Sequence, residues 1–327
     1  MRLQALLTAV LLTAGCAAPG TTTVARESAA ALPASVGAAF QTALDANRDR
    51  LGYPGALVGV STPDGAWFGV TGESGRGSGR SPQRDDHTRI GSLTKTFTVM
   101  VLLQLVDRGK VSLADPIGRY ISGLPNGDTA TLRDLAAMTS GIPNYSASAV
   151  FGEAWSADPA GTVFTPQQLV KFVRKEPALF PAGRQMDYSN TNTVLLGMVI
   201  EKVTGQPMTQ VYQANLLEPL GMSQTSFPGS SPALRQPHLD GVNQPDGAVR
   251  DATDWNPSWT FTAGGMISTL DDMHTWTVAL GTGSGLISEE VQRLRAASTM
   301  STVPPNDAEL TYALGFFVDH IVAALPP

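Results

Sequence analysis

The stretch IGSLTKTFTV, residues 90–99, places a lysine three residues after a serine at the start of a long apolar run. On a helix, residues three apart lie on one face with Cβ atoms about 5–6 Å apart, so Ser92 and Lys95 would be neighbours. The nearly continuous apolar run 97–106 predicts a buried core helix that is too short to cross a bilayer. The pattern therefore favours a buried core helix with this pair near its beginning.

The Ser92–Lys95 pair has two interpretations. Lys95 can take the serine proton if burial or a neighbouring cation lowers its pKa from the ordinary value of about 10.4. The alternative is a surface serine beside a solvated lysine, because short motifs match by accident often. The spacing alone leaves both open.

The segment MDYSNTN, residues 186–192, carries a second candidate motif. Tyr188 is the only tyrosine of this sequence with an asparagine, Asn190, two residues later. A phenol can pass a proton beside Lys95, and an amide can support the lysine and bind a substrate carbonyl. The alternative is an amphipathic tyrosine before a helix that Asn190 caps.

The remaining sequence predicts an α+β fold. Helical spacing covers residues 35–51, and two β-rich runs, ALVGVST and AWFGVTG, flank a Pro-Asp-Gly turn. Strand character returns at residues 310–324, so we expect an antiparallel sheet built from both chain ends with a large helical insertion. Further helices are predicted to start at Thr131, Thr165, Thr191, Ser268 or Thr269, and Ser288.

Composition excludes several classes of protein. The 327 residues are 42% hydrophobic and 15% charged with a net charge of −6, which is typical of a soluble globular domain and unlike a nucleic-acid binder. Four scattered histidines and one cysteine give no zinc-ligand spacing, so no metal site is predicted. No Gly-x-Ser-x-Gly motif occurs, which argues against an α/β-hydrolase.

The N-terminus is typical of an exported protein. Residues 1–16 combine Arg2, a short apolar run and small residues before Cys16, which predicts a signal peptide with a lipobox and a lipid anchor on Cys16. A plain cleaved signal is the alternative. Residues 17–34 are poor in large apolar side chains and are expected to form a flexible tether before a domain at 35–327. The expected location is extracytoplasmic, on the outer face of the bacterial cell membrane.

Between about Leu44 and Phe317 the chain resembles the serine β-lactamase and D-alanyl-D-alanine carboxypeptidase superfamily. The similarity is closest to the branch that holds class C β-lactamases and actinobacterial DD-carboxypeptidases. It rests on the order and spacing of five segments: RIGSLTKTFT, MTSGIPNY, FPAGRQMDYSNTNTVLLGMVIEKVTG, LLEPLGMSQTSF and TAGGMISTLDDMHTW.

This resemblance implies roles for five residues. Ser92 would be the acylated nucleophile, Lys95 its base partner, Tyr188 a proton shuttle and Asn190 a ligand of the substrate amide. Trp259 would line the cleft, although it can equally be a packing residue. The family chemistry needs no cofactor, and the resemblance leaves open whether the lysine or the tyrosine takes the serine proton.

The family's third motif, Lys or His followed by a variable residue and Gly, does not occur in the sequence. It would be expected just after the strand that matches Tyr312–His320, so we expect a chain that is truncated before it. The C-terminal strands and helix of the fold would then be missing. Loss of one oxyanion donor typically lowers turnover roughly 10²–10³-fold, so weak or absent activity is expected.

Three functions remain open at this point. The leading one is a serine hydrolase of the D-alanyl-D-alanine carboxypeptidase or β-lactamase type, acting on peptidoglycan stem peptides or β-lactams as a monomer. The second is an esterase for small esters. The third is a lipid-tethered protein that binds penicillin or wall peptide without turnover.

Overall fold

The computed structural model describes residues 30–62, 64–244, 248–283, 285–297, 300–301 and 310–319. The predicted signal segment with Cys16, and residues 17–29 of the predicted tether, lie outside these ranges. Within them, no helix has the length and apolar character that a membrane span requires.

The described part of the chain alternates short strands with helices, as an α+β fold does. The α-helices are α1 Ala34–Leu51, α2 Thr94–Asp107, α3 Leu132–Ala136, α4 Ala149–Ser156, α5 Pro166–Lys171, α6 Asn190–Thr204, α7 Met208–Tyr212, α8 Leu270–Thr282 and α9 Glu289–Ala297. The strands are β1 Gly55–Thr62, β2 Gly65–Gly72, β3 Thr88–Arg89, β4 Val242–Asn243, β5 Arg250–Asp251, β6 Ile267–Ser268, β7 Met300–Ser301, β8 Leu310–Tyr312 and β9 Phe317–Asp319.

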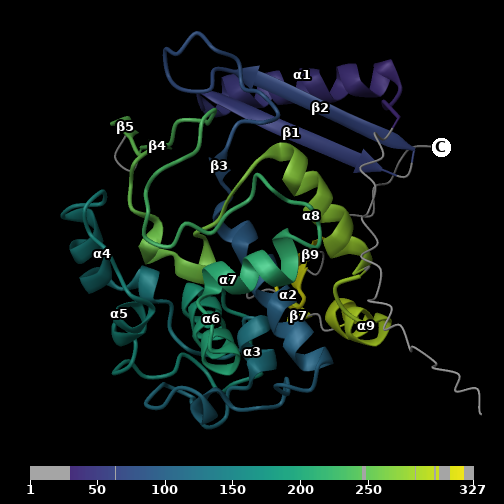
Figure 1. Ribbon diagram of the computed structural model, residues 1–327. Helices are drawn as coiled ribbons and strands as arrows, with labels where there is room; N and C mark the ends of the chain where they lie inside the picture. The colour runs from purple at the N-terminus through teal and green to yellow at the C-terminus, as the bar shows by residue number, and fades with distance from the viewer. Residues whose placement is uncertain are drawn as a thin grey trace, which may run out of the picture.

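The predicted hairpin is confirmed and forms one end of the molecule (Figure 1). β1 and β2 pair antiparallel from Gly55 opposite Gly72 to Thr62 opposite Gly65. Helix α1 covers one face, where Phe40 packs on Trp67 with ring centroids 5.3 Å apart. Helix α8 contacts β1, so the hairpin lies between two helices.

The core surrounds α2, as its apolar run predicts. Twelve of its fourteen residues, Thr94–Leu105, are buried, and α6 packs against it. Helices α3 and α5 pack on α6 in turn, so the serine-lysine segment begins at the edge of a helical core (Figure 1).

Local capping chemistry starts several helices where the sequence predicts. Thr131 and Thr165 each form a capping box, and Thr269 accepts a hydrogen bond from the backbone N–H of Asp272. At α6, Ser189 occupies the cap position and Asn190 is the first helical residue, so the capping alternative for Asn190 is wrong.

The C-terminal segment differs from the prediction in detail. The expected strand 310–324 is a hairpin, β8–β9, within the described residues, and 320–324 lie outside them. The turn follows from Gly315, whose φ of 89° is a left-handed conformation and whose Cα approaches Val99 so closely that a Cβ would lie 2.7 Å from it.

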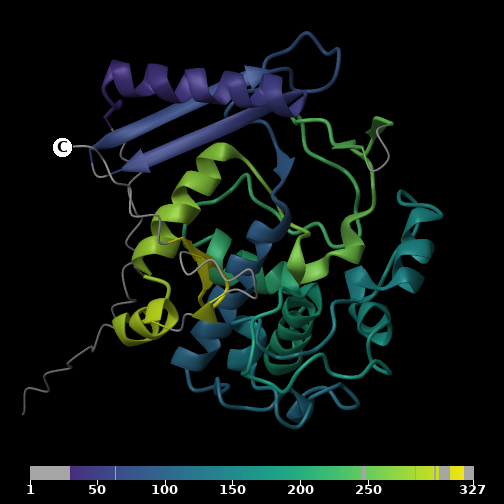
Figure 2. The same ribbon diagram turned by 180° about the vertical axis from the view of Figure 1, so that it is seen from behind.

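The two chain ends therefore contribute antiparallel strands to separate small sheets in the described structure. The first is β1–β2 and the second is β7–β8–β9, not the single sheet that we expected. Figure 2 shows the yellow strands of the second sheet beside α2 and α9, away from the hairpin. In the described part of the chain, no helix follows α9.

Candidate active site

Ser92 lies between strand β3, which is paired with β6, and the core helix α2. β3 pairs with β6, and Gly91, with a φ of 51°, turns the chain into the short 3₁₀-helix Gly91–Leu93. Because glycine adopts this left-handed conformation without strain, the turn brings Ser92 to the surface as an exposed side chain just before α2.

Lys95 is buried one turn later, with only 1% of its surface exposed. Its Nζ lies 3.1 Å from Ser92 Oγ and donates to the carbonyl of Ala263 at 2.7 Å. Burial lowers the pKa of this amine from 10.5 to about 7, because an apolar environment disfavours the charged form. A substantial fraction of Lys95 is thus neutral at neutral pH and able to accept the serine proton.

Tyr188 completes a three-residue cluster. Its ring centroid lies 4.9 Å from Lys95 Nζ, and its phenol lies close enough to Ser92 for the serine hydroxyl to affect the pKa of the phenol. Burial raises the pKa of the phenol, while the nearby Ser92 hydroxyl partly offsets this. The phenol therefore stays protonated near neutral pH, which makes Lys95 the better proton acceptor in the free protein and leaves Tyr188 suited to relay a proton.

The C-terminal hairpin holds the Tyr188 ring. Phe317 stacks on it with centroids 5.9 Å apart, and Tyr312 meets it edge-on at 6.3 Å. The sequence predicts only a strand for this segment. The stacking was not predictable, because it depends on the turn at Gly315 that returns the chain towards α3.

Asn190 lies two residues after Tyr188 but turns to a neighbouring segment. Its side-chain amide donates to Ser146 Oγ at 2.9 Å, and its backbone N–H donates to Asn144 Oδ1 at 3.2 Å. Lys95 is held by the Ala263 carbonyl, so the support expected from Asn190 comes from a backbone group. A role for Asn190 in binding the substrate amide stays a prediction.

Trp259 is half-buried in the 3₁₀-helix Pro257–Trp259. Its ring packs on Phe151 and Trp155, with centroid distances of 6.0 and 5.5 Å. Its carbonyl accepts a hydrogen bond from the buried Tyr145 hydroxyl. These contacts give it a packing role, and its place in the cleft wall stays a prediction.

The backbone carbonyl of Ala263 positions Lys95 and is not predictable from the sequence. Ala263 ends the 3₁₀-helix Phe261–Ala263, whose first residue has a φ of 40°. Such strained non-glycine conformations concentrate at functional sites. Thr262 secures the segment by donating to the Thr193 carbonyl at 2.8 Å, while its own carbonyl accepts from Thr98 at 2.8 Å. Any residue type supplies a carbonyl, so no sequence signal marks it.

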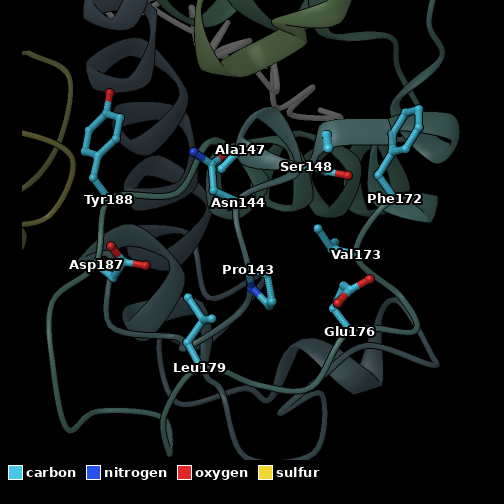
Figure 3. A pocket seen from close by; sticks show the side chains of 11 residues that line it. Pro143, Asn144, Ala147, Ser148, Phe172, Val173, Glu176, Leu179, Asp187 and Tyr188 are labelled. Carbon is cyan, nitrogen blue, oxygen red and sulfur yellow. The ribbon is translucent and has the colours of Figure 1, made fainter. Parts of the chain in front are cut away.

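A cavity of about 460 Å³ adjoins the cluster, and Tyr188 forms part of its wall (Figure 3). The other walls come from the segment 143–149, from residues 172–179 after α5, and from Asp187. No group of three or more His, Cys, Asp or Glu side chains that could hold a metal ion occurs among the described residues. The cluster's own chemistry is nucleophilic: a hydroxyl beside a partly neutral amine.

Comparison with known proteins agrees with this chemistry. The family model described as Beta-lactamase matches residues 40–324. The D-alanyl-D-alanine-carboxypeptidase/endopeptidase AmpH of Escherichia coli (strain K12) is 30% identical over 264 residues, covering 77% of this chain and 62% of that protein. The chain thus spans less than two thirds of the length of this curated relative.

Two solved structures are similar over most of the chain. A D-stereospecific amidohydrolase from Streptomyces sp. is 34% identical with a TM-score of 0.78, over 86% of this chain and 82% of that one. The D-amino acid amidase from Ochrobactrum anthropi SV3, complexed with L-phenylalanine, is 25% identical with a TM-score of 0.76, over 89% and 82%.

Proposed function

The chain belongs to the beta-lactamase family, and we propose that it is a serine hydrolase that forms an acyl-enzyme on Ser92. The single observation that carries the proposal is the position of Lys95. Its buried amine lies 3.1 Å from Ser92 Oγ and has a pKa of about 7. A buried amine in this protonation balance is an effective general base for a serine hydroxyl.

In the proposed acylation, the proton of Ser92 moves to Lys95 across this contact. Neutral Lys95 takes the Ser92 proton as Oγ bonds to the substrate carbonyl carbon, and the backbone N–H of Ser92 faces the developing oxyanion. Breakdown of the tetrahedral intermediate releases an amine, which receives its proton from Lys95 by way of the Tyr188 hydroxyl. Water then hydrolyses the ester on Ser92.

For the substrate, we propose peptides or amides built on D-amino acids, such as peptidoglycan stem peptides ending in D-alanyl-D-alanine. Support comes from the names of the similar proteins: a D-alanyl-D-alanine-carboxypeptidase/endopeptidase, a D-stereospecific amidohydrolase and a D-amino acid amidase. β-Lactams and small esters are alternative acyl donors for the same serine. Asn190 and Trp259 are proposed to contact the acyl donor.

The proposed location is the outer face of the cell membrane, with a lipid anchor on Cys16 and no transmembrane helix needed. The support is the N-terminal sequence alone: an apolar run followed by small residues and the only cysteine. The reduced turnover expected from the missing third motif also stays a prediction. In that case the chain would act as a penicillin- or peptide-binding protein that is acylated but turns over slowly.

One experiment separates these outcomes. The purified chain is incubated with a fluorescent penicillin, and intact mass and gel fluorescence are followed with time. A Ser92→Ala variant is the control. Adduct formation that requires Ser92 supports the proposal, and its decay rate distinguishes hydrolysis from stoichiometric binding. If the parent chain and Ser92→Ala label equally, or neither labels, the proposal is wrong.

A further inference from the structure

The cavity beside Tyr188 is lined by both apolar and acidic side chains, so the charge of its wall is negative. Phe172, Val173 and Leu179 contribute apolar surface, and Glu176 and Asp187 contribute carboxylates. None of the side chains that line it in the described structure is basic. In the view of Figure 3, Asp187 and Glu176 lie on opposite sides of the cavity, with Leu179 between them.

The cavity shares one residue with the catalytic cluster. Tyr188 lines it, and the ring of the same side chain lies 4.9 Å from Lys95 Nζ. Figure 3 shows the Tyr188 hydroxyl pointing away from the Asp187 end of the cavity. The cavity and the catalytic cluster therefore share one tyrosine ring.

The side chains that line the cavity determine which chemical group of a ligand would bind there. Apolar walls favour methylene groups, while two carboxylates without a basic partner in the wall attract a cation and repel an anion. Asp187 is half-buried, so its charge is less screened than that of the exposed Glu176. A primary ammonium at the end of a short apolar chain satisfies both parts of the wall.

We propose that this cavity is a subsite for the acyl part of the substrate and that it selects acyl groups that end in a primary amine. The inference rests on the proposed function, because it places the acyl carbonyl at Ser92. It narrows the substrate to amides or peptides whose acyl side carries a free amine, and it assigns Glu176 and Asp187 as specificity residues.

The first test measures binding without any reaction. Affinities of the parent chain for 4-phenylbutylamine, its N-acetyl derivative and 4-phenylbutyrate are determined by NMR titration at low salt. One exposed ion pair contributes up to about fivefold in affinity, so we expect the amine to bind roughly five- to twentyfold more tightly than its acetylated form. The preference should shrink in high salt, and the carboxylate should bind most weakly.

Variants assign that preference to the two carboxylates. In Glu176→Gln/Asp187→Asn the ratio of amine to acetylated affinity should fall to about one. The matched control is Glu290→Gln, which removes the same charge from an exposed position on α9 and should keep the ratio. Each single variant is measured as well, with circular dichroism to show that the fold is kept.

A second measurement separates this inference from the proposed function. Saturating 4-phenylbutylamine should slow labelling of Ser92 by a fluorescent penicillin in the parent chain and much less in the double variant. Equal affinity for the amine and its acetylated form, or a preference that survives in the double variant, overturns the subsite. Absence of Ser92 labelling with an intact amine preference overturns the proposed function and the acyl-subsite role, while leaving an amine-binding cavity.

Discussion

Replacing the buried Lys95 should change how the free energy of unfolding depends on pH. Lys95 has a pKa of about 7 in the folded protein and 10.5 when exposed. Between these values the unfolded chain holds a proton that the folded chain has lost, so the free energy of unfolding rises with pH in this window. At 1.36 kcal/mol per pKa unit, the parent chain gains about 3 kcal/mol from this group between pH 7 and 9.5.

The variant Lys95→Met removes this gain because methionine does not titrate. We expect the difference in unfolding free energy between the parent and Lys95→Met to change by about 3 kcal/mol over this range, with the parent gaining. The absolute difference is less informative, since the variant also leaves the Ala263 carbonyl without its 2.7 Å donor.

The assay is urea unfolding at pH 6, 7, 8 and 9.5. The matched control is Lys171→Met, which removes an exposed lysine from the end of α5 and should follow the parent at every pH. Parallel pH profiles for the parent and Lys95→Met would refute the reasoning. They would show that the amine keeps an ordinary pKa in the fold.

Three further substitutions test the surroundings of the site. Tyr188→Phe should keep the fold by circular dichroism but lower the rate of Ser92 acylation about 10²–10⁴-fold, and an unchanged rate would remove the phenol from the mechanism. Thr96→Val orphans the buried Trp276 indole N–H, which now donates at 2.8 Å, and should cost about 1–3 kcal/mol in urea unfolding; no loss would contradict the contact. Gly197→Ala puts a Cβ 2.5 Å from the Thr262 hydroxyl and should cost about 1–3 kcal/mol, whereas unchanged stability would mean that the segment yields freely.

The sequence predicts the parts of the fold that local chemistry determines. Capping residues such as Thr131 and Thr165 and the apolar run in α2 act within a few residues of themselves, and the structure confirms them. For the C-terminal hairpin the sequence predicts one strand, because the turn depends on the approach of Gly315 to Val99, a contact between distant residues.

The same distinction applies to the site. Ser92, Lys95 and Tyr188 were identified from side-chain chemistry at fixed spacing, and the structure brings them together. The Ala263 carbonyl could not be identified, because backbone groups carry no residue signature. Asn190 was also identified by its spacing, but the spacing does not determine the hydrogen-bond partner of its side-chain amide, which is Ser146 in the structure.

The most direct measurement of the central claim is the pH profile of Ser92 acylation. The rate of labelling by a fluorescent penicillin is measured from pH 5.5 to 9 under conditions of excess label. The rate should rise as Lys95 loses its proton, with a midpoint near the pKa of about 7. Lys95→Met should lower the rate about 10²–10⁴-fold at pH 9 and abolish this rise, so the difference from the parent narrows towards pH 5.5. A profile that is flat across this range, or one that Lys95→Met leaves unchanged, would contradict the assignment of Lys95 as the base.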